Sequence, residues 1–209
     1  EEGVATIQLD DGKANALSHD MLEGIERALD DAEASEAKVL VIIGREGKFS
    51  AGFDLKVMTS GPQQARDLLG RGAELGLRLY EFPIPVVFGV TGHALAMGGI
   101  LLSCADVRVG AEGNFKTGLP EVRVGMPVPA FAVELCRDRV SPQWFTRSVQ
   151  LAEALTPEQA LEAGLILGFC SGDQHILRVG CTQQPPAICG VDARAIGAAL
   201  GIDDVIGTR

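Results

Sequence analysis

Residues 84–111, IPVVFGVTGHALAMGGILLSCADVRVGA, contain the elements that decide the fold. An apolar run at 84–92 is typical of a buried strand, the spacing at 94–105 is helix-like, and 106–111 predicts another strand. A strand, a helix and a strand in succession predict a crossover between parallel strands. The pair Gly98–Gly99 stands in the first turn of the helix, where glycine costs roughly 0.5–1 kcal/mol relative to alanine. We therefore expect something to approach this backbone closely.

The rest of the chain continues the alternation of strands and helices, which predicts an α/β fold with mainly parallel strands. Strands are expected at 4–10 and 38–45, the second buried on both faces because its apolar run is continuous. Ser18 predicts the N-cap of a helix that follows it, and a second long helix is expected over 62–82. Short helices are expected at 127–140, 141–152 and 156–166, the last two opened by Ser141 and Thr156 ahead of a proline.

Composition and charge exclude several classes of function. The chain has 209 residues and a formal net charge of -10, without a basic patch, which argues against nucleic-acid binding. No apolar run reaches about 18 residues, so no membrane span is expected. The first residues lack the basic and apolar regions of a signal peptide. Cysteines without CxxC spacing and separated histidines predict neither a disulfide framework nor a metal site, and they fit a reducing, cytoplasmic setting.

Two glycine-rich segments are the first candidates for a functional site. GKFSAGFDLK (47–56) and GHALAMGGILL (92–102) each follow a buried strand, at the strand ends where open α/β sheets bind ligands. A helix that begins near Met97 presents unpaired N–H groups and a positive dipole end. The two segments could thus donate one N–H each to a single oxygen, which is the geometry of an oxyanion hole. Tight packing explains small residues at 50–52 and 98–99 equally well.

A carboxylate is the third candidate. Glu121 lies in the segment FKTGLPEVRVGMPVP (115–129), between Pro120 and Val122, where its neighbours are apolar or turn-forming. Apolar surroundings raise the pKa of a carboxyl group toward neutrality, so such a group can exchange protons near pH 7. A solvated surface glutamate is the alternative interpretation.

Together these segments resemble a known family. NAL, GKFSAGFDLK, GHALAMGGILLSCADVRVG and FKTGLPEVRVGM, in this order, are similar to the crotonase, or enoyl-CoA hydratase/isomerase, superfamily from about Val4 to Leu165. The resemblance implies a spiral ββα fold, usually assembled as a homotrimer or a dimer of trimers. It also implies an acyl-CoA thioester ligand, with no cofactor besides the coenzyme A of the substrate. The carbonyl oxygen would be held by the N–H groups of Phe53 and Met97, and the glycines would let the thioester reach the backbone.

Within this family, the acid/base residues separate the possible reactions. Hydratases of the family use a pair of glutamates to activate a water, and the first of these positions is matched here by Ile100. The second is matched by Glu121, in a segment that resembles the GLNE segment of Δ3,Δ2-enoyl-CoA isomerases with Pro120 in place of Asn. A single carboxyl group favours an isomerase that moves a proton from C2 to C4. Hydration or thioester hydrolysis, and a catalytically degenerate acyl-CoA-binding protein, are the alternatives.

The remaining residue assignments come from the same resemblance. Lys56 would pair with a phosphate of coenzyme A, although a solvated lysine is nearly as good an interpretation. We expect structural roles for Asp106, for His93 and for Trp144. The segments predict contacts with the acyl-CoA from Ala51, Gly52, Asp54, Lys56 and Gly98.

The resemblance also divides the chain. Residues 1–152 are expected to form the spiral core, and residues 153–209 a helical C-terminal region used in assembly. After about residue 166 the sequence departs from the family pattern, and only 191–201 keeps helical spacing.

Overall fold

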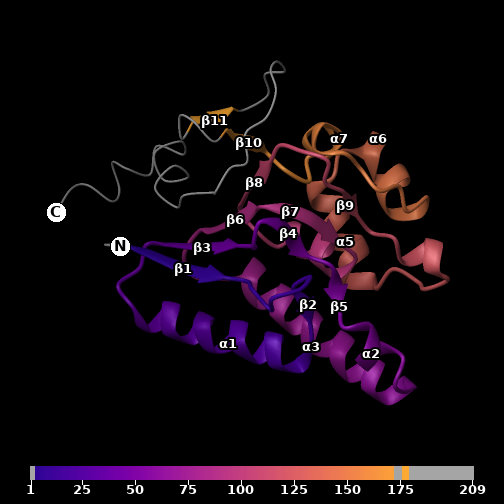
Figure 1. The fold of residues 1–209 in the computed structure, drawn as a ribbon, viewed down its shortest axis with the longest axis horizontal. Coiled ribbons are helices and arrows are strands. Elements are labelled where there is room, and N and C mark those ends of the chain that lie inside the picture. The colour runs from indigo at the N-terminus through magenta and orange to yellow at the C-terminus, as the bar shows by residue number, and fades with distance from the viewer. Residues whose placement is uncertain (1–2, 172–175, 179–209) are drawn as a thin grey trace.

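The computed structural model describes residues 3–171 and 176–178, which form an α/β fold (Figure 1). A six-stranded sheet has the order β1-β3-β6-β8-β10-β11, and its neighbouring strands are parallel except for the antiparallel pair β10–β11. A second sheet has the order β4-β7-β9, and a third consists of β2 and β5. All strand pairs in these two sheets are parallel. The mainly parallel α/β architecture expected from the sequence is therefore confirmed.

The helices and strands have the following bounds. The strands are β1 Val4–Gln8, β2 Ala16–Leu17, β3 Val39–Ile43, β4 Gly47–Ser50, β5 Gly52–Phe53, β6 Val86–Val90, β7 Gly92–Leu95, β8 Val107–Ala111, β9 Thr117–Gly118, β10 Gly168–Ser171 and β11 Ile176–Arg178. The α-helices are α1 His19–Ala34, α2 Leu55–Met58, α3 Pro62–Tyr80, α4 Met97–Leu102, α5 Ala130–Arg139, α6 Pro142–Phe145 and α7 Pro157–Ala163. A 3₁₀ turn, η1, covers Glu121–Val124, and a π-helical turn, η2, covers Thr146–Gln150.

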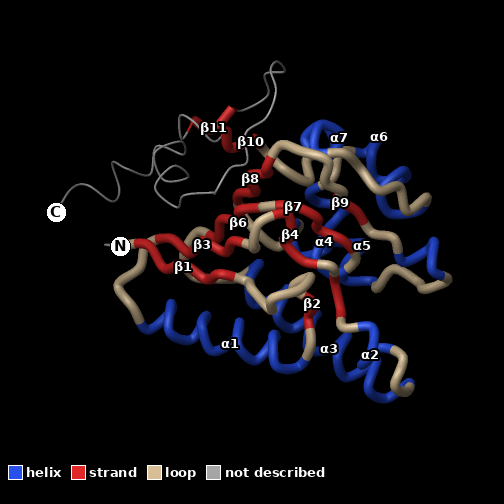
Figure 2. The backbone as a smooth tube through the Cα atoms, in the orientation of Figure 1, coloured by secondary structure: helices blue, strands red, loops and turns tan. Residues whose placement is uncertain are grey.

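The chain winds as a spiral in which each turn repeats the same order of elements. One strand enters the six-stranded sheet, the next enters the β4-β7-β9 sheet, and a helix or helical turn follows. The successive turns are β3, β4 and α3, then β6, β7 and α4, then β8, β9 and η1 (Figure 2). This repetition confirms the spiral ββα core, and it brings the segments after β4, β7 and β9 side by side.

Two segments differ from their predicted local structure. No strand was expected within 47–56, and residues 94–95 were expected in a helix, but they contain the short strands β4 and β5 and the end of β7, so α4 begins at Met97 rather than near residue 94. Their pairing joins positions far apart in sequence, such as Gly47 with Gly92. Local apolar periodicity does not report such long-range pairing.

The buried strands form the centre of the core. Leu40 and Ile42 of β3 belong to the same apolar cluster as residues of α1 and α3, the helices below the sheet in Figure 1. Val39 and Val41, on the opposite face of the strand, belong to a second cluster. All four side chains are at most 3% exposed, which confirms a strand buried on both faces.

Side-chain capping follows the sequence at two of three helix starts. The Ser18 hydroxyl accepts the N–H of Met21 at 3.2 Å, and Thr156 forms a capping box with Gln159. Ser141 is also the N-cap of its helix, ahead of Pro142 as predicted, but its side chain makes no capping hydrogen bond.

The C-terminal predictions are only partly covered by the structure. The helical pattern at 191–201 lies outside the described residues. Strand β10 pairs with β8 and so extends the six-stranded sheet beyond the expected boundary at residue 152, and that boundary stays a prediction. Within the described ranges, no helix is both long and apolar enough to span a bilayer.

Candidate active site

The two glycine-rich segments touch where β5 passes the start of α4. Gly52 has φ +91°, and a Cβ atom placed on it would lie 2.9 Å from the carbonyl oxygen of Leu95 and 3.1 Å from the nitrogen of Met97. Only glycine fits both this backbone conformation and this space. The backbones at 52–53 and 95–97 are therefore in direct contact.

The directions of the N–H groups follow from the hydrogen bonds around them. Asp54 donates its N–H to the carbonyl of Leu17 in β2 at 3.1 Å. Since successive N–H groups of an extended chain point to opposite sides, the N–H of Phe53 points away from β2. Met97 is the first residue of α4, so its N–H has no intrahelical acceptor. The side chains of both residues reach the same place, Gly72 of α3.

The glycine pair in the first turn of α4 has a packing explanation. A Cβ on Gly98 would lie 2.5 Å from the carbonyl oxygen of Ser50, and one on Gly99 would lie 2.6 Å from that of Gly118. The atoms that approach this backbone belong to the protein itself, in β4 and β9. This corrects the expectation that a ligand requires the glycines, because neighbouring strands already do.

Glu121 lies on the third turn of the spiral, at the start of η1. The carbonyl of Gly118 accepts the N–H of Ala96 at 3.0 Å, next to Met97. Glu121 follows three residues later, so its Cα lies within about 11 Å of that of Gly118. Its side chain is only 6% exposed, and its Oε2 has no hydrogen-bond partner among the described residues. Burial raises the pKa of the Glu121 carboxyl above its ordinary value.

The other predicted contact residues differ in their exposure to solvent. Ala51 and Lys56 are exposed, and Gly52 and Gly98 are buried. The carboxylate of Asp54 caps α2 by accepting the N–H of Lys56 at 2.8 Å. Their roles in binding an acyl-CoA stay predictions.

Residues expected to be structural have the partners that such a role needs. Asp106 accepts the N–H of Val86 at 2.8 Å and so joins two strands of the main sheet. His93 accepts the N–H of Lys116 through Nδ1 at 3.1 Å, and its ring meets that of Phe115 edge-on. Trp144 is 5% exposed and packs in the core.

Ile100 is buried in α4, 1% exposed, within the same core. An apolar side chain therefore fills the position that the family resemblance compares with the first hydratase glutamate.

One residue of this region was missed by the sequence analysis. Asn15 has φ +53° and is fully buried. Its side-chain amide donates to the carbonyls of Leu9 at 2.8 Å and Phe49 at 3.1 Å, and its Oδ1 accepts the N–H of Asp11 at 3.0 Å. Asn15 therefore fixes the start of β2 against β4. The quoted NAL motif contained the residue, but a single asparagine before a short strand carries no signal of these contacts.

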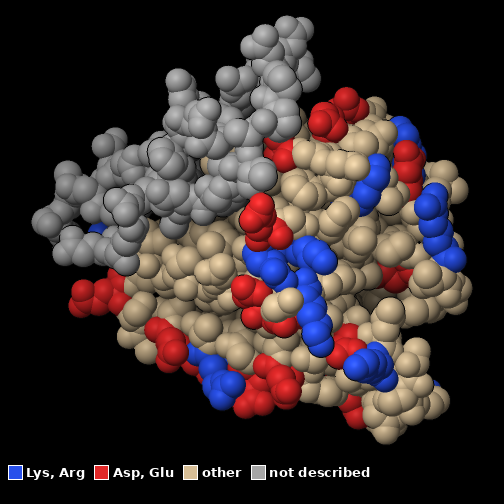
Figure 3. All heavy atoms as spheres, in the orientation of Figure 1, with Lys and Arg blue, Asp and Glu red and all other residues tan. Residues whose placement is uncertain are grey.

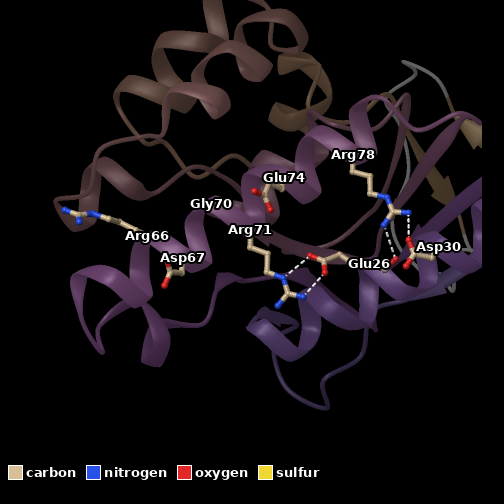
Figure 4. A pocket seen from close by; sticks show the side chains of 8 residues that line it. All are labelled: Glu26, Asp30, Arg66, Asp67, Gly70, Arg71, Glu74 and Arg78. Carbon is tan, nitrogen blue, oxygen red and sulfur yellow. Dashed lines mark hydrogen bonds and ion pairs between the residues drawn. The ribbon is translucent and has the colours of Figure 1, made fainter.

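A separate cavity of about 670 Å³ lies between α1 and α3 (Figure 4). Arginines of α3 face acidic side chains of α1 across it, with Arg71 bonded to Glu26 and Arg78 to Asp30, each at 2.7 Å. Arg71 and Arg78 are thus neutralised by these carboxylates, and the ion pairs join the two helices across the groove.

In Figure 3, acidic and basic side chains are interspersed on the visible face.

The site thus has a pair of backbone N–H groups from successive turns of a ββα spiral, next to a turn that holds a buried carboxyl group. Comparisons with known proteins show the family of the chain. The family model of enoyl-CoA hydratase/isomerase matches residues 1–178. The chain therefore belongs to the enoyl-CoA hydratase/isomerase family, within the crotonase superfamily.

Similar proteins carry names of both activities. A probable enoyl-CoA hydratase of Bacillus subtilis is 34% identical over 79% of this chain and 65% of its own length. The mitochondrial enoyl-CoA delta isomerase 1 of Mus musculus is 30% identical over 82% of this chain and 61% of its own length. The crystal structure of a probable enoyl-CoA hydratase from Mycobacterium tuberculosis superposes with a TM-score of 0.82, at 38% identity over 96% of this chain and 78% of that chain. The chain thus spans less than two thirds of the length of both curated relatives.

Proposed function

We propose that this protein binds an enoyl-CoA thioester and shifts its double bond by moving a proton through an enolate. The N–H groups of Phe53 and Met97 donate to the thioester carbonyl oxygen, where negative charge develops. Loss of one such donor typically costs about 2.7–4 kcal/mol of transition-state stabilisation. Glu121 removes the proton at C2 and returns it at C4.

The observation that carries this proposal is the state of the Glu121 carboxyl. It is buried, its Oε2 has no partner in the described part of the chain, and burial raises its pKa above the ordinary carboxyl value, which makes it a stronger base than an exposed glutamate. The buried Ile100 offers no group that could hold a water for hydration. A single acid/base residue supports a proton shift over addition of water.

The test compares Glu121→Gln with the unchanged protein on a panel of 3-enoyl-CoA substrates. Glutamine keeps the shape of the side chain but cannot carry the proton, so we expect turnover to fall about 10²–10⁴-fold while the affinity for acyl-CoA is retained. Glu134→Gln, on the exposed surface of α5, is the matched control and should leave turnover unchanged. An unchanged rate in Glu121→Gln contradicts the proposal.

Hydration is the second candidate, because the Bacillus relative is named a probable hydratase. Product mass separates the reactions, since isomerisation leaves the mass unchanged and hydration adds one water. Binding without deuterium exchange at the α-carbon would instead indicate a degenerate acyl-CoA-binding protein. Assembly as a homotrimer or dimer of trimers, in the cytoplasm, is part of the same proposal, and sedimentation of the purified chain measures the assembly.

A further inference from the structure

Ser50 is a buried polar residue to which neither the family resemblance nor the proposed reaction assigns a role. It is the last residue of β4 and is fully buried. A buried hydroxyl is retained at low cost only when it is hydrogen-bonded, and here both of its bonds are made to the main chain. Their partners are the residues that shape the candidate site.

The first pair of contacts connects Ser50 to the segment that presents the Phe53 N–H. The Ser50 hydroxyl donates to the carbonyl of Asn15 at 2.8 Å and accepts the N–H of Gly52 at 3.2 Å. The acceptor is itself anchored, because the Asn15 side chain is bonded to β4 and to the segment before β2. The hydroxyl therefore fixes the orientation of the Gly52 N–H, one peptide before that of Phe53.

The second contact connects Ser50 to the helix that presents the Met97 N–H. The carbonyl oxygen and Cβ of Ser50 lie 2.5 and 2.8 Å from the point that a Cβ on Gly98 would occupy. The first turn of α4 thus rests directly on Ser50. One residue sets the position of both amides, through its hydroxyl on one side and its main chain on the other.

We propose that Ser50 is a positioning residue that sets the relative orientation of the Phe53 and Met97 amides around the substrate carbonyl. This inference rests on the proposed function, and it adds a residue to that site. Preorganised donors stabilise a developing oxyanion only if they already point at it, and an error of about 1 Å can cost about 10²-fold in rate.

The test replaces the hydroxyl and measures donor geometry directly. In Ser50→Ala the Gly52 N–H loses its acceptor, and the carbonyl stretch of bound octanoyl-CoA, labelled with carbon-13 at the thioester carbonyl, reports how strongly that carbonyl is polarised. We expect the stretch to move back toward its value in water. We also expect kcat on a 3-enoyl-CoA to fall about 10–100-fold while KM changes less than about twofold, because the two donors bind the charged oxygen of the transition state more strongly than the neutral carbonyl of the substrate.

Ser148→Ala is the matched control. Ser148 is also fully buried, but its hydroxyl has no partner among the described residues, so its removal should change neither the carbonyl stretch nor kcat. If Ser50→Ala does not fold, Ser50→Cys keeps a group at the same place. A thiol is a weaker hydrogen-bonding partner, so the stretch and kcat should take intermediate values.

The outcomes separate this inference from the function it rests on. If the unchanged protein neither polarises the carbonyl nor exchanges deuterium at the α-carbon, the proposed function is wrong. If the unchanged protein polarises the carbonyl, but Ser50→Ala or Ser50→Cys polarises it equally and keeps the same kcat, only the role of Ser50 is wrong.

Discussion

The substitution Gly98→Ala should destabilise the protein, although alanine is the better helix former. The added Cβ would lie 2.5 Å from the carbonyl oxygen and 2.8 Å from the Cβ of Ser50, whereas carbon atoms in contact prefer about 3.5–4.0 Å. Ser50 cannot swing aside, because its hydroxyl is bonded to the main chain of Asn15. Overpacking of this kind costs about 1–3 kcal/mol, against a helix gain of about 0.5–1 kcal/mol. At the midpoints of these two ranges, the net loss is about 1 kcal/mol.

Gly24→Ala is the control for this loss. Gly24 lies inside α1, and a Cβ added there meets nothing within 4 Å. This variant should therefore gain about 0.5–1 kcal/mol. The helix gain is common to both variants, so urea unfolding followed by circular dichroism should separate them by the overpacking cost of about 1–3 kcal/mol. A Gly98→Ala protein as stable as Gly24→Ala would refute the packing explanation of the glycine pair.

Gly98→Ala should also slow the proposed reaction. Relief of the overlap moves α4 away from β4, and the Met97 N–H moves with it. A displacement of this size in a positioned group can cost up to about 10²-fold in rate. Deuterium exchange at the α-carbon of a bound acyl-CoA should therefore slow in Gly98→Ala and stay unchanged in Gly24→Ala. Destabilisation without slower exchange would mean that α4 moves while its first N–H does not.

Two further predictions concern stability alone. Burial raises the pKa of the Glu121 carboxyl, so the folded protein binds this proton more tightly than the unfolded chain does. The stability that this group contributes is therefore fully present below the ordinary carboxyl pKa, and it is lost as the pH rises through the pKa of the folded state. Glu121→Gln should therefore exceed the unchanged protein in free energy of unfolding at neutral pH, with the difference vanishing at acid pH in denaturant titrations. Thr156→Ala breaks the capping box of α7 and should cost about 1 kcal/mol in thermal unfolding, and a loss near zero would contradict the role of the cap.

The sequence predicted the elements whose signals are local. The apolar runs that became β3 and β6 needed no partner to be recognised, and Ser18 and Thr156 marked the helix starts that they cap. Strands β4 and β7 were missed because they are short, rich in small residues and defined by pairing across successive turns of the spiral.

The candidate site, too, was predicted only in part from the sequence. The order of motifs indicated which residues come together, and the contact between Gly52 and Met97 agrees with that order. It could not show why the glycines are needed, since Gly98 and Gly99 are explained by contacts with β4 and β9, two strands that the sequence did not predict. Nor could it show the bonds of Ser50 and Asn15, because a buried hydroxyl and a buried amide have no periodicity.

The glycines and the chemistry are nevertheless connected through the spiral. Each turn places one element of the site after its strand in the β4-β7-β9 sheet, namely Phe53, Met97 and Glu121. Gly98 and Gly99 lie where the first turn of α4 contacts the ends of β4 and β9, and a Cβ on either would overlap a carbonyl oxygen there. The glycines at 98 and 99 set how closely these turns pack, so a larger side chain at either position should displace the Phe53 and Met97 amides from one another even without a bound substrate.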